Sequence, residues 1–182
     1  MKPTREFLFK HPAHFIALGF GSGMAPKAPG TFGTLAALPI YSVTMWVGGV
    51  GGVGGVGATW LGGAGINGTG LLATIAVLLF FIGIWASGVT GAALGVSDHS
   101  DIVIDEIAAF LLILVFTPPS WPWIVLAFVL FRVFDILKPW PISVADRRIK
   151  GGFGVMFDDL LADIFTIICL WFLRSIFVGV TL

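Results

Sequence analysis

Long apolar stretches separated by short polar segments dominate this chain. Residues 28–97 contain no Asp, Glu, Lys or Arg, and from Leu160 to the C-terminus only Asp163 and Arg174 interrupt the apolar run. A helix needs about 20 apolar residues to cross the hydrocarbon core of a bilayer. The pattern therefore predicts five membrane-spanning helices, near residues 35–53, 69–94, 102–117, 122–137 and 160–180.

The composition agrees with this pattern. Of the 182 residues, 57% are hydrophobic and 11% are charged, and the mean hydropathy is +1.01. A soluble domain typically has about 25% charged residues. We therefore expect an all-α integral membrane protein in which residues 1–182 form a single polytopic domain. The ten basic and ten acidic residues balance, which gives no reason to expect a nucleic-acid partner.

The N-terminal residues mix Lys2, Arg5 and Lys10 with aromatic side chains. They lack the order of a signal peptide, so we expect a short amphipathic segment lying along the membrane interface. At the other end of the chain, the single cysteine, Cys169, lies within an apolar run. This position argues against a disulfide, a cysteine-based metal cluster or a cysteine nucleophile.

The placement of basic residues predicts how the chain is oriented. The prolines at 118, 119 and 122 indicate a tight reversal between two antiparallel helices, and the Gly- and Val-rich stretch 48–65 indicates a flexible connection. With five spans and a cytoplasmic N-terminus, the outer loops contain no Lys or Arg, as the positive-inside rule requires. The same topology brings the polar segments 19–34, 98–106 and 132–163 together at the cytoplasmic face.

The first polar segment is rich in glycine and precedes an apolar helix. Glycines allow backbone N–H groups to turn toward an anion, and a helix N-terminus adds a positive dipole end. This pattern makes Ser22, Gly23, Gly30 and Thr31 candidate phosphate-binding residues, although the spacing is not that of a Walker loop. The alternative is structural, because small residues also allow close helix packing and Thr31 or Thr34 would serve as a cap.

Acidic residues enter the apolar runs at two points. Asp105 and Glu106 stand at the start of one predicted span, and Asp158 and Asp159 stand just before the last one. Carboxylates at a membrane boundary are costly unless they are solvated, paired or bound to a cation, and oxygen ligands of this kind suit Mg²⁺. These four residues are therefore candidate metal ligands. A solvated acidic loop at a helix N-terminus is the alternative, and it applies equally to Asp98 and Asp101.

A basic residue and a carboxylate stand three apart near the end of the fourth predicted span. Arg132 and Asp135 share one helix face, and Lys138 follows just before a proline. They form either a structural ion pair or, with Arg132 as a paired donor, part of a phosphate-binding site. Metal-held carboxylates together with a basic residue supply what cleavage of a phosphomonoester requires.

The ordered motifs of the chain resemble the phosphatidylglycerophosphatase A family over about residues 15–162. The motifs are Gly-Phe-Gly-Ser-Gly from 19, Pro-Gly-Thr-x-Gly-Thr from 29, Asp-His at 98, Asp-Glu at 105, Phe-Arg-x-x-Asp from 131, Lys-Pro-Trp-Pro-Ile from 138, Asp-Arg at 146, Gly-Gly-x-Gly from 151 and Asp-Asp at 158. The resemblance implies Mg²⁺-dependent removal of the terminal phosphate from phosphatidylglycerophosphate, which yields phosphatidylglycerol in the bacterial inner membrane.

The resemblance also implies roles for particular residues. Arg132 and Lys138 would face the substrate phosphate. Lys27, Asp101 and Asp163 fall outside the family pattern and rank lower. The metal and catalytic carboxylates that the resemblance implies are Asp105, Glu106, Asp135, Asp158 and Asp159. Which of these is nucleophile, base or ligand stays open, as does homo-oligomerisation.

Two other functions are consistent with parts of the pattern. Charges inside apolar helices are also found in ion-coupled transporters, although a conduction path would place polar residues toward both faces. A phosphatase acting on another lipid phosphate would have the same general features. We expect membrane lipids to surround the protein in each case.

Overall fold

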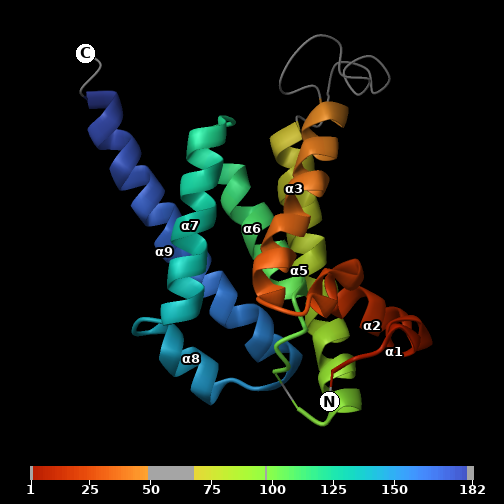
Figure 1. Ribbon diagram of the computed structural model, residues 1–182. Coiled ribbons are helices and arrows are strands. Elements are labelled where there is room, and N and C mark those ends of the chain that lie inside the picture. Colours follow the sequence, from red (N-terminus) through yellow and green to blue (C-terminus); the bar gives the residue numbers. More distant parts are fainter. Residues whose placement is uncertain (1, 49–67, 97, 180–182) are drawn as a thin grey trace.

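The computed structural model describes residues 2–48, 68–96 and 98–179, and within these ranges every regular element is a helix (Figure 1). This finding confirms the predicted all-α fold. The elements are α1 (Arg5–Lys10), α2 (Pro12–Ala17), the 3-10 helix η1 (Gly19–Met24), α3 (Pro29–Val47), α5 (Gly68–Leu94), α6 (Ile104–Phe116), α7 (Trp121–Leu137), α8 (Ile142–Arg148) and α9 (Gly151–Gly179).

Two short helices form the N-terminal segment. The Thr4 hydroxyl accepts a hydrogen bond from the Phe7 amide and begins α1, and the His11 ring accepts one from the Ala13 amide and begins α2. The His14 ring is hydrogen-bonded to Thr90 of α5 at 3.0 Å, so the segment is held against the helical bundle.

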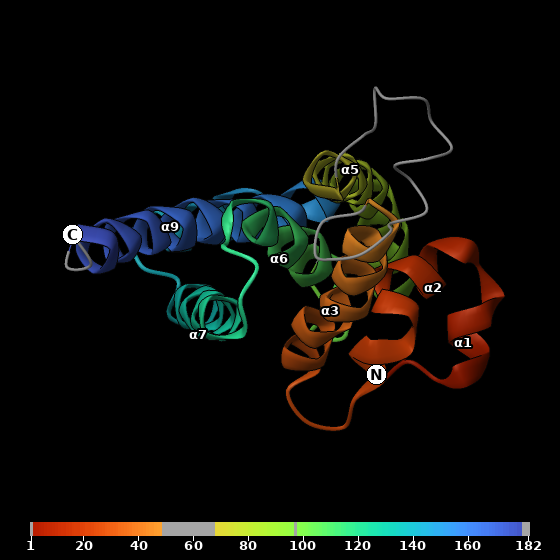
Figure 2. The ribbon, with the colours of Figure 1, turned by 90° about the horizontal axis from the view of Figure 1, so that it is seen from above.

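Helix α6 lies at the centre of the bundle. Figure 2 shows it between the α3 and α5 pair and the α7 and α9 pair. Its Ile107, Phe110, Leu111 and Ile113 side chains are fully buried. A helix that is apolar on all sides is stable only when other helices surround it. Side chains at the start of α6 are therefore held inside the protein.

Five long helices lie near the five segments predicted to be spans, with two corrections at their ends. Helix α3 begins at Pro29 rather than near residue 35, because proline suits the first helical position. Helix α9 begins at Gly151 rather than near residue 160. Gly152 allows this early start, because a Cβ there would overlap the Ile84 carbonyl oxygen of α5. Residues 49–53 of the predicted first span, and the predicted flexible connection beyond Gly48, lie outside the described residues.

Two features support contact with lipid. Within the described ranges, one helix, Gly68–Leu94, is long and apolar enough to cross a membrane, and only 28% of its most apolar stretch is buried inside the protein. Large apolar side chains also point outward from the other helices, including Val43, Val129, Ile168 and Phe172. A soluble protein seldom exposes so much contiguous apolar surface. The number of membrane crossings stays a prediction.

Polar elements collect at one end of the bundle. In Figure 1 the helices α1, α2 and α8 and the connection between α5 and α6 lie at the lower end, whereas the turn between α6 and α7 lies at the opposite end. Trp121 and Pro122 begin α7 after this turn, as the proline cluster predicted. The fold thus brings together the ends of the helices that carry the predicted site residues.

Candidate active site

Arg132 on α7 forms the centre of a buried polar cluster. Its Nη1 atom lies 2.8 Å from Asp135 Oδ2 and 3.5 Å from Glu106 Oε1, and it donates to the Thr34 hydroxyl at 3.5 Å. The predicted pairing of Arg132 with Asp135 is confirmed. The cluster also joins α3, α6 and α7, because Thr34 and Glu106 come from the other two helices. The Thr34 hydroxyl in turn donates to the Gly30 carbonyl at 2.9 Å.

The first turn of α3 packs directly against this cluster. A Cβ at Gly30 would overlap Glu106 Oε1, and one at Gly33 would lie 3.2 Å from Glu106 Oε2. Only residues without a side chain allow this approach. Among the described residues, no side chain caps the N-terminus of α3. The uncapped N-terminus of α3, which is the positive end of the helix dipole, therefore lies beside the cluster.

Lys138 connects the ends of three helices. It is the left-handed C-cap of α7, and its Nζ atom donates to Asp146 of α8 at 2.8 Å and to Asp158 of α9. Burial alone would lower the pKa of Lys138, but the hydrogen bonds and charges of the two carboxylates outweigh this effect and raise the pKa above its usual range. Lys138 therefore stays charged at neutral pH.

The remaining carboxylates lie on the facing sides of α6 and α9. Asp158, Asp159 and Asp163 are all buried, and each carries at least one buried oxygen with no hydrogen-bond partner in the described part of the chain. Asp105 and Glu106 are only partly buried, but each also carries one buried oxygen without a hydrogen-bond partner among the described residues. Asp159 interacts electrostatically with Asp105, Asp135 and Asp163, and Glu106 interacts with Asp159. The carboxylates thus form one acidic cluster, which an ordinary protein interior would not tolerate without a positive partner.

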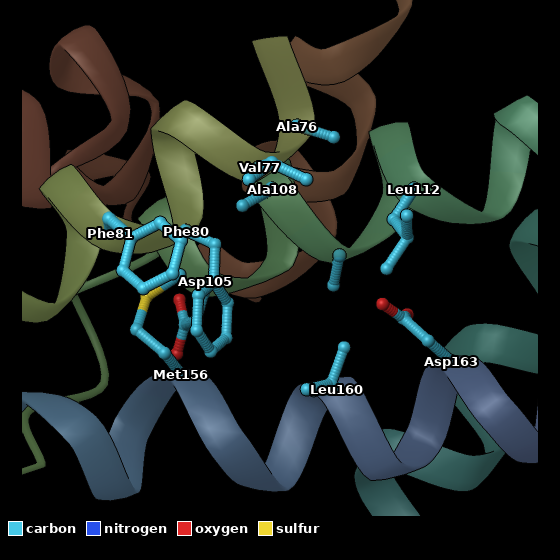
Figure 3. Close-up of a pocket in the computed structure, with 11 residues that line it drawn as sticks. Ala76, Val77, Phe80, Phe81, Asp105, Ala108, Leu112, Met156, Leu160 and Asp163 are labelled. Atoms are coloured by element: carbon cyan, nitrogen blue, oxygen red, sulfur yellow. The ribbon is translucent and has the colours of Figure 1, made fainter. Parts of the chain in front are cut away.

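A pocket of about 270 Å³ borders this cluster between α5, α6 and α9 (Figure 3). Asp105 and Asp163 both line it, and the other lining side chains are apolar. In Figure 3 the Asp105 carboxyl group lies beside Phe80 and Met156, and Asp163 projects from α9 near Leu112.

Comparison with known proteins shows to which family this chain belongs. The family model for phosphatidylglycerophosphatase A matches residues 15–174. This chain belongs to that family. It is 36% identical to phosphatidylglycerophosphatase A of Haemophilus influenzae, covering 91% of both chains, and 34% identical to that of Escherichia coli, covering 90% of this chain and 84% of the relative.

A third relative has a different name. It comes from Bacteroides thetaiotaomicron, is 36% identical over 84% of this chain and 87% of its own, and is named provisionally as a phosphatidylinositol-3-phosphatase. No solved structure is significantly similar to this chain. The predicted family resemblance is confirmed, and all three relatives are named as enzymes that act on a phosphorylated lipid.

The phosphatidylglycerophosphatase A motifs of the first polar segment contact the other segments at different points. Gly30 reaches the Arg132 cluster, and Gly23 packs against the backbone of Asp101 in the second segment. Ser22 donates to the Gly19 carbonyl at 2.8 Å, within the first segment. The predicted contact of Ser22, Gly23 and Thr31 with phosphate stays a prediction.

Asp101 lies in the turn before α6, which begins at Ile104, and its carboxylate accepts a hydrogen bond from Ser100. One further expectation about motif geometry is wrong. Asp158 and Asp159 do not precede the last helix but lie within its second and third turns, because α9 begins at Gly151. This early start places them opposite α6.

Three residues of the site were missing from the sequence-based set. Thr34 contacts Arg132, Asp146 contacts Lys138, and Asp163 extends the acidic cluster. A weak signal existed for Thr34, which stands four residues after Gly30 and so on the same helix face. Asp163 likewise stands four residues after Asp159. No sequence spacing links Lys138 with Asp146, because their contact depends on how α8, which carries Asp146, folds back toward the end of α7.

The arrangement places positive charge and carboxylate oxygens side by side. Arg132 and the α3 N-terminus supply positive charge, and the acidic cluster supplies carboxylate oxygens. In the described ranges, no three or more His, Cys, Asp or Glu side chains form a ready-made group that could hold a metal ion. Metal binding by Asp105, Glu106, Asp158 and Asp159 therefore stays a prediction.

Proposed function

We propose that this chain is a Mg²⁺-dependent phosphatase that hydrolyses the terminal phosphate of phosphatidylglycerophosphate, giving phosphatidylglycerol and phosphate. The names of the two relatives from Haemophilus influenzae and Escherichia coli support the substrate. The chemistry of the site supports the reaction class, because phosphoryl transfer depends mainly on positioning and on stabilising charge.

One observation carries the proposal. The Arg132 Nε atom is buried and has no hydrogen-bond partner among the described residues, while its Nη1 atom is fixed by Asp135 and Glu106. A buried N–H donor without an acceptor is costly unless a ligand supplies one. A phosphate oxygen is the acceptor that suits a guanidinium held beside a helix N-terminus. Arg132 thus points to where the substrate phosphate binds.

The donor chemistry around this position fits Mg²⁺. As Asp163 also does, Asp105, Glu106, Asp158 and Asp159 each carry a buried oxygen without a hydrogen-bond partner among the described residues. These residues would hold the ion, which when bound would neutralise phosphate charge and lower the pKa of a bound water. Their mutual repulsion in the absence of a cation is the physical reason for the assignment.

Each side chain of the site would have its own role in hydrolysis. Arg132 binds a phosphate oxygen and orients the phosphorus, and Asp135 and Glu106 fix the guanidinium. A carboxylate of the acidic cluster accepts a proton from the attacking water as the new P–O bond forms. The bond between phosphorus and the glycerol oxygen breaks, and this oxygen takes up the proton that the carboxylate had accepted from the water, which gives phosphatidylglycerol and phosphate. Lys138 holds Asp158 in position.

The membrane arrangement belongs to the same proposal. The five long helices α3, α5, α6, α7 and α9 would cross the bacterial inner membrane, with the polar end of the bundle in the cytoplasm. The outward apolar side chains on these helices support this arrangement. The charged residues at that end follow the positive-inside rule, and they include Arg5, Lys27, Lys138, Arg147 and Lys150. An ion-coupled transporter is disfavoured, because a conduction path would also need polar residues at the opposite end.

Release of phosphate by the detergent-purified protein tests the reaction. Phosphatidylglycerophosphate is compared with phosphatidic acid, phosphatidylinositol 3-phosphate and a soluble phosphomonoester, each with Mg²⁺ and with a chelator. We expect selective release from phosphatidylglycerophosphate that stops with chelator and returns with Mg²⁺. Preference for phosphatidylinositol 3-phosphate would favour the function named for the Bacteroides relative. No release from any lipid by folded protein would overturn the proposal.

Binding of Mn²⁺ tests the metal ligands without relying on turnover. Electron paramagnetic resonance measures free Mn²⁺ in titrations of the parent, Asp159→Asn and Glu6→Gln, the last being an exposed control on α1. We expect Asp159→Asn to weaken Mn²⁺ binding at least tenfold and to abolish phosphate release, while Glu6→Gln behaves like the parent. Equal Mn²⁺ affinity in all three proteins would remove Asp159 from the metal site.

A further inference from the structure

The proposed hydrolysis does not use the space in the pocket between α5, α6 and α9. Its volume is about 270 Å³, just below the range of about 300–1,000 Å³ typical of small-molecule sites. The α5 wall consists of carbon atoms from Val77, Phe80 and Phe81, and Leu112 and Leu160 contribute further apolar surface. A pocket of this size and lining suits part of a hydrocarbon chain and not a polar head group.

The pocket borders the acidic cluster beside the proposed phosphate site. Its polar walls are Asp105 and Asp163, and both residues belong to the acidic cluster through their interactions with Glu106 and Asp135. Figure 3 shows the Asp105 carboxyl group between the side chains of α5 and Met156 of α9. A molecule with its phosphate at this cluster therefore has its adjoining atoms next to the pocket.

The α5 wall also faces the outside of the bundle. Val77 and Phe81 line the pocket and are 48% and 64% exposed, and the neighbouring Leu78 is 54% exposed. They belong to the one described helix that is long and apolar enough to cross a membrane. A ligand could therefore enter sideways from the hydrocarbon region without passing through water.

We propose that this pocket binds one acyl chain of the phospholipid whose phosphate is held at Arg132. The inference rests on the proposed function, since it assumes a lipid phosphate substrate. The chain runs along Val77, Phe80 and Phe81, and its glycerol end lies toward Asp105. The pocket takes only part of one chain, so the second chain stays in the surrounding lipid. Filling the pocket should therefore impair long-chain substrates selectively.

Ala76 offers a way to fill the pocket. It lines the cavity and is 3% exposed, so Ala76→Phe places a ring where the chain would lie. The matched control is Leu78→Phe, which adds a ring on the exposed side of the same helix. Values of kcat/KM are measured with dioleoyl and dihexanoyl forms of phosphatidylglycerophosphate. We expect the long-to-short ratio to fall at least tenfold in Ala76→Phe and to stay within twofold in Leu78→Phe.

The outcomes separate this inference from the proposed function. If the parent hydrolyses neither lipid, the proposed function fails. If the parent is active and Ala76→Phe keeps the parental ratio, the acyl-chain site is wrong and the function stands.

A second measurement uses the unaltered protein, in case Ala76→Phe does not fold. Phosphatidylglycerophosphate with a diazirine in one acyl chain is photolysed with the parent, and the labelled residues are identified by mass spectrometry. We expect label on residues 76–81 or 156–160, and at least fivefold less label from phosphatidylcholine carrying the same diazirine. Equal labelling by both lipids, or label only elsewhere, would overturn the inference.

Discussion

Gly30 of α3 lies directly against the Glu106 carboxylate of α6. A Cβ at position 30 would overlap Glu106 Oε1 and lie 3.0 Å from Arg132 Nη2. The absence of a side chain at position 30 therefore allows the α3 N-terminus to approach the residues proposed to bind phosphate. Close approach matters because the field of a helix terminus falls off within its first turn.

Replacing Gly30 by alanine should separate these elements. We expect Gly30→Ala to lower kcat/KM at least tenfold, because the added methyl group displaces Glu106 and Arg132 from their present positions. The matched control is Gly88→Ala in α5, where the nearest atom to the new Cβ is 3.8 Å away. Gly88→Ala should keep parental activity. Full activity of Gly30→Ala would show that the contact has no part in catalysis.

Arg132 should be essential for binding phosphate in the transition state. Loss of one such donor typically costs about 10²–10³ in kcat, and Arg132→Gln also leaves Glu106 and Asp135 without their positive partner. We expect a loss of at least that size in steady-state phosphate release. Arg148→Gln on α8 is the control, because Arg148 is exposed. A similar loss in both variants would indicate a general effect of charge at this end of the protein.

Lys138 should stabilise the junction of α7, α8 and α9. Lys138→Met removes the partner of both Asp146 and Asp158, and we expect a lower midpoint of thermal unfolding in detergent together with lower activity. Lys27→Met, at an exposed position, should change neither quantity. An unchanged midpoint in Lys138→Met would mean that solvent fully replaces the two ion pairs.

The pH dependence of this stabilisation follows from the raised pKa of Lys138. A basic group whose pKa is raised on folding stabilises the folded state fully at any pH below its pKa in the unfolded state, which is about 10.4 for lysine. This stabilisation is lost only as pH rises through the raised pKa of the folded state. The difference in unfolding midpoint between parent and Lys138→Met should therefore stay constant from about pH 7 to about pH 9.5. A difference that disappears within this window would contradict the raised pKa.

His14 should make the attachment of the N-terminal helices sensitive to acid. Burial, assisted by the charges of His11 and Lys10, lowers the pKa of His14, so the neutral ring bonds Thr90 at neutral pH. Because the pKa is lowered, the stabilisation of the docked segment by neutral His14 is fully present above the ordinary histidine pKa of about 6.5. It weakens as pH falls below this value and the ring takes up a proton. Hydrogen exchange of residues 12–17, corrected for intrinsic rates, should accelerate between about pH 7.5 and about pH 5.5.

A variant without this titration provides the control for the acid effect. His14→Gln cannot take up a proton in this range, so its corrected exchange should not change with pH. If the parent and His14→Gln respond equally to acid, another group causes the loosening. If neither responds, the contact with Thr90 does not hold the segment in place.

The sequence by itself determined the helical fold, the five long helices and the family. Apolar run length and proline position are local properties, so they predicted the α6–α7 turn and the approximate course of α5, α6 and α7. The ordered motifs are also local properties of the sequence, so they identified the family without the structure. Helix ends were less predictable, because the start of α9 depends on the close contact of Gly152 with α5, which no local property of the sequence shows.

Only the tertiary structure decided which polar residues share a site. Arg132 meets Thr34 across 98 residues and Lys138 meets Asp146 through the fold of α8, and no local spacing encodes either contact. Likewise, Asp163 joins Asp105 at one pocket because α6 and α9 pack side by side. The sequence specifies which groups are available, but burial and distance set their partners. Those quantities exist only once the helices have packed.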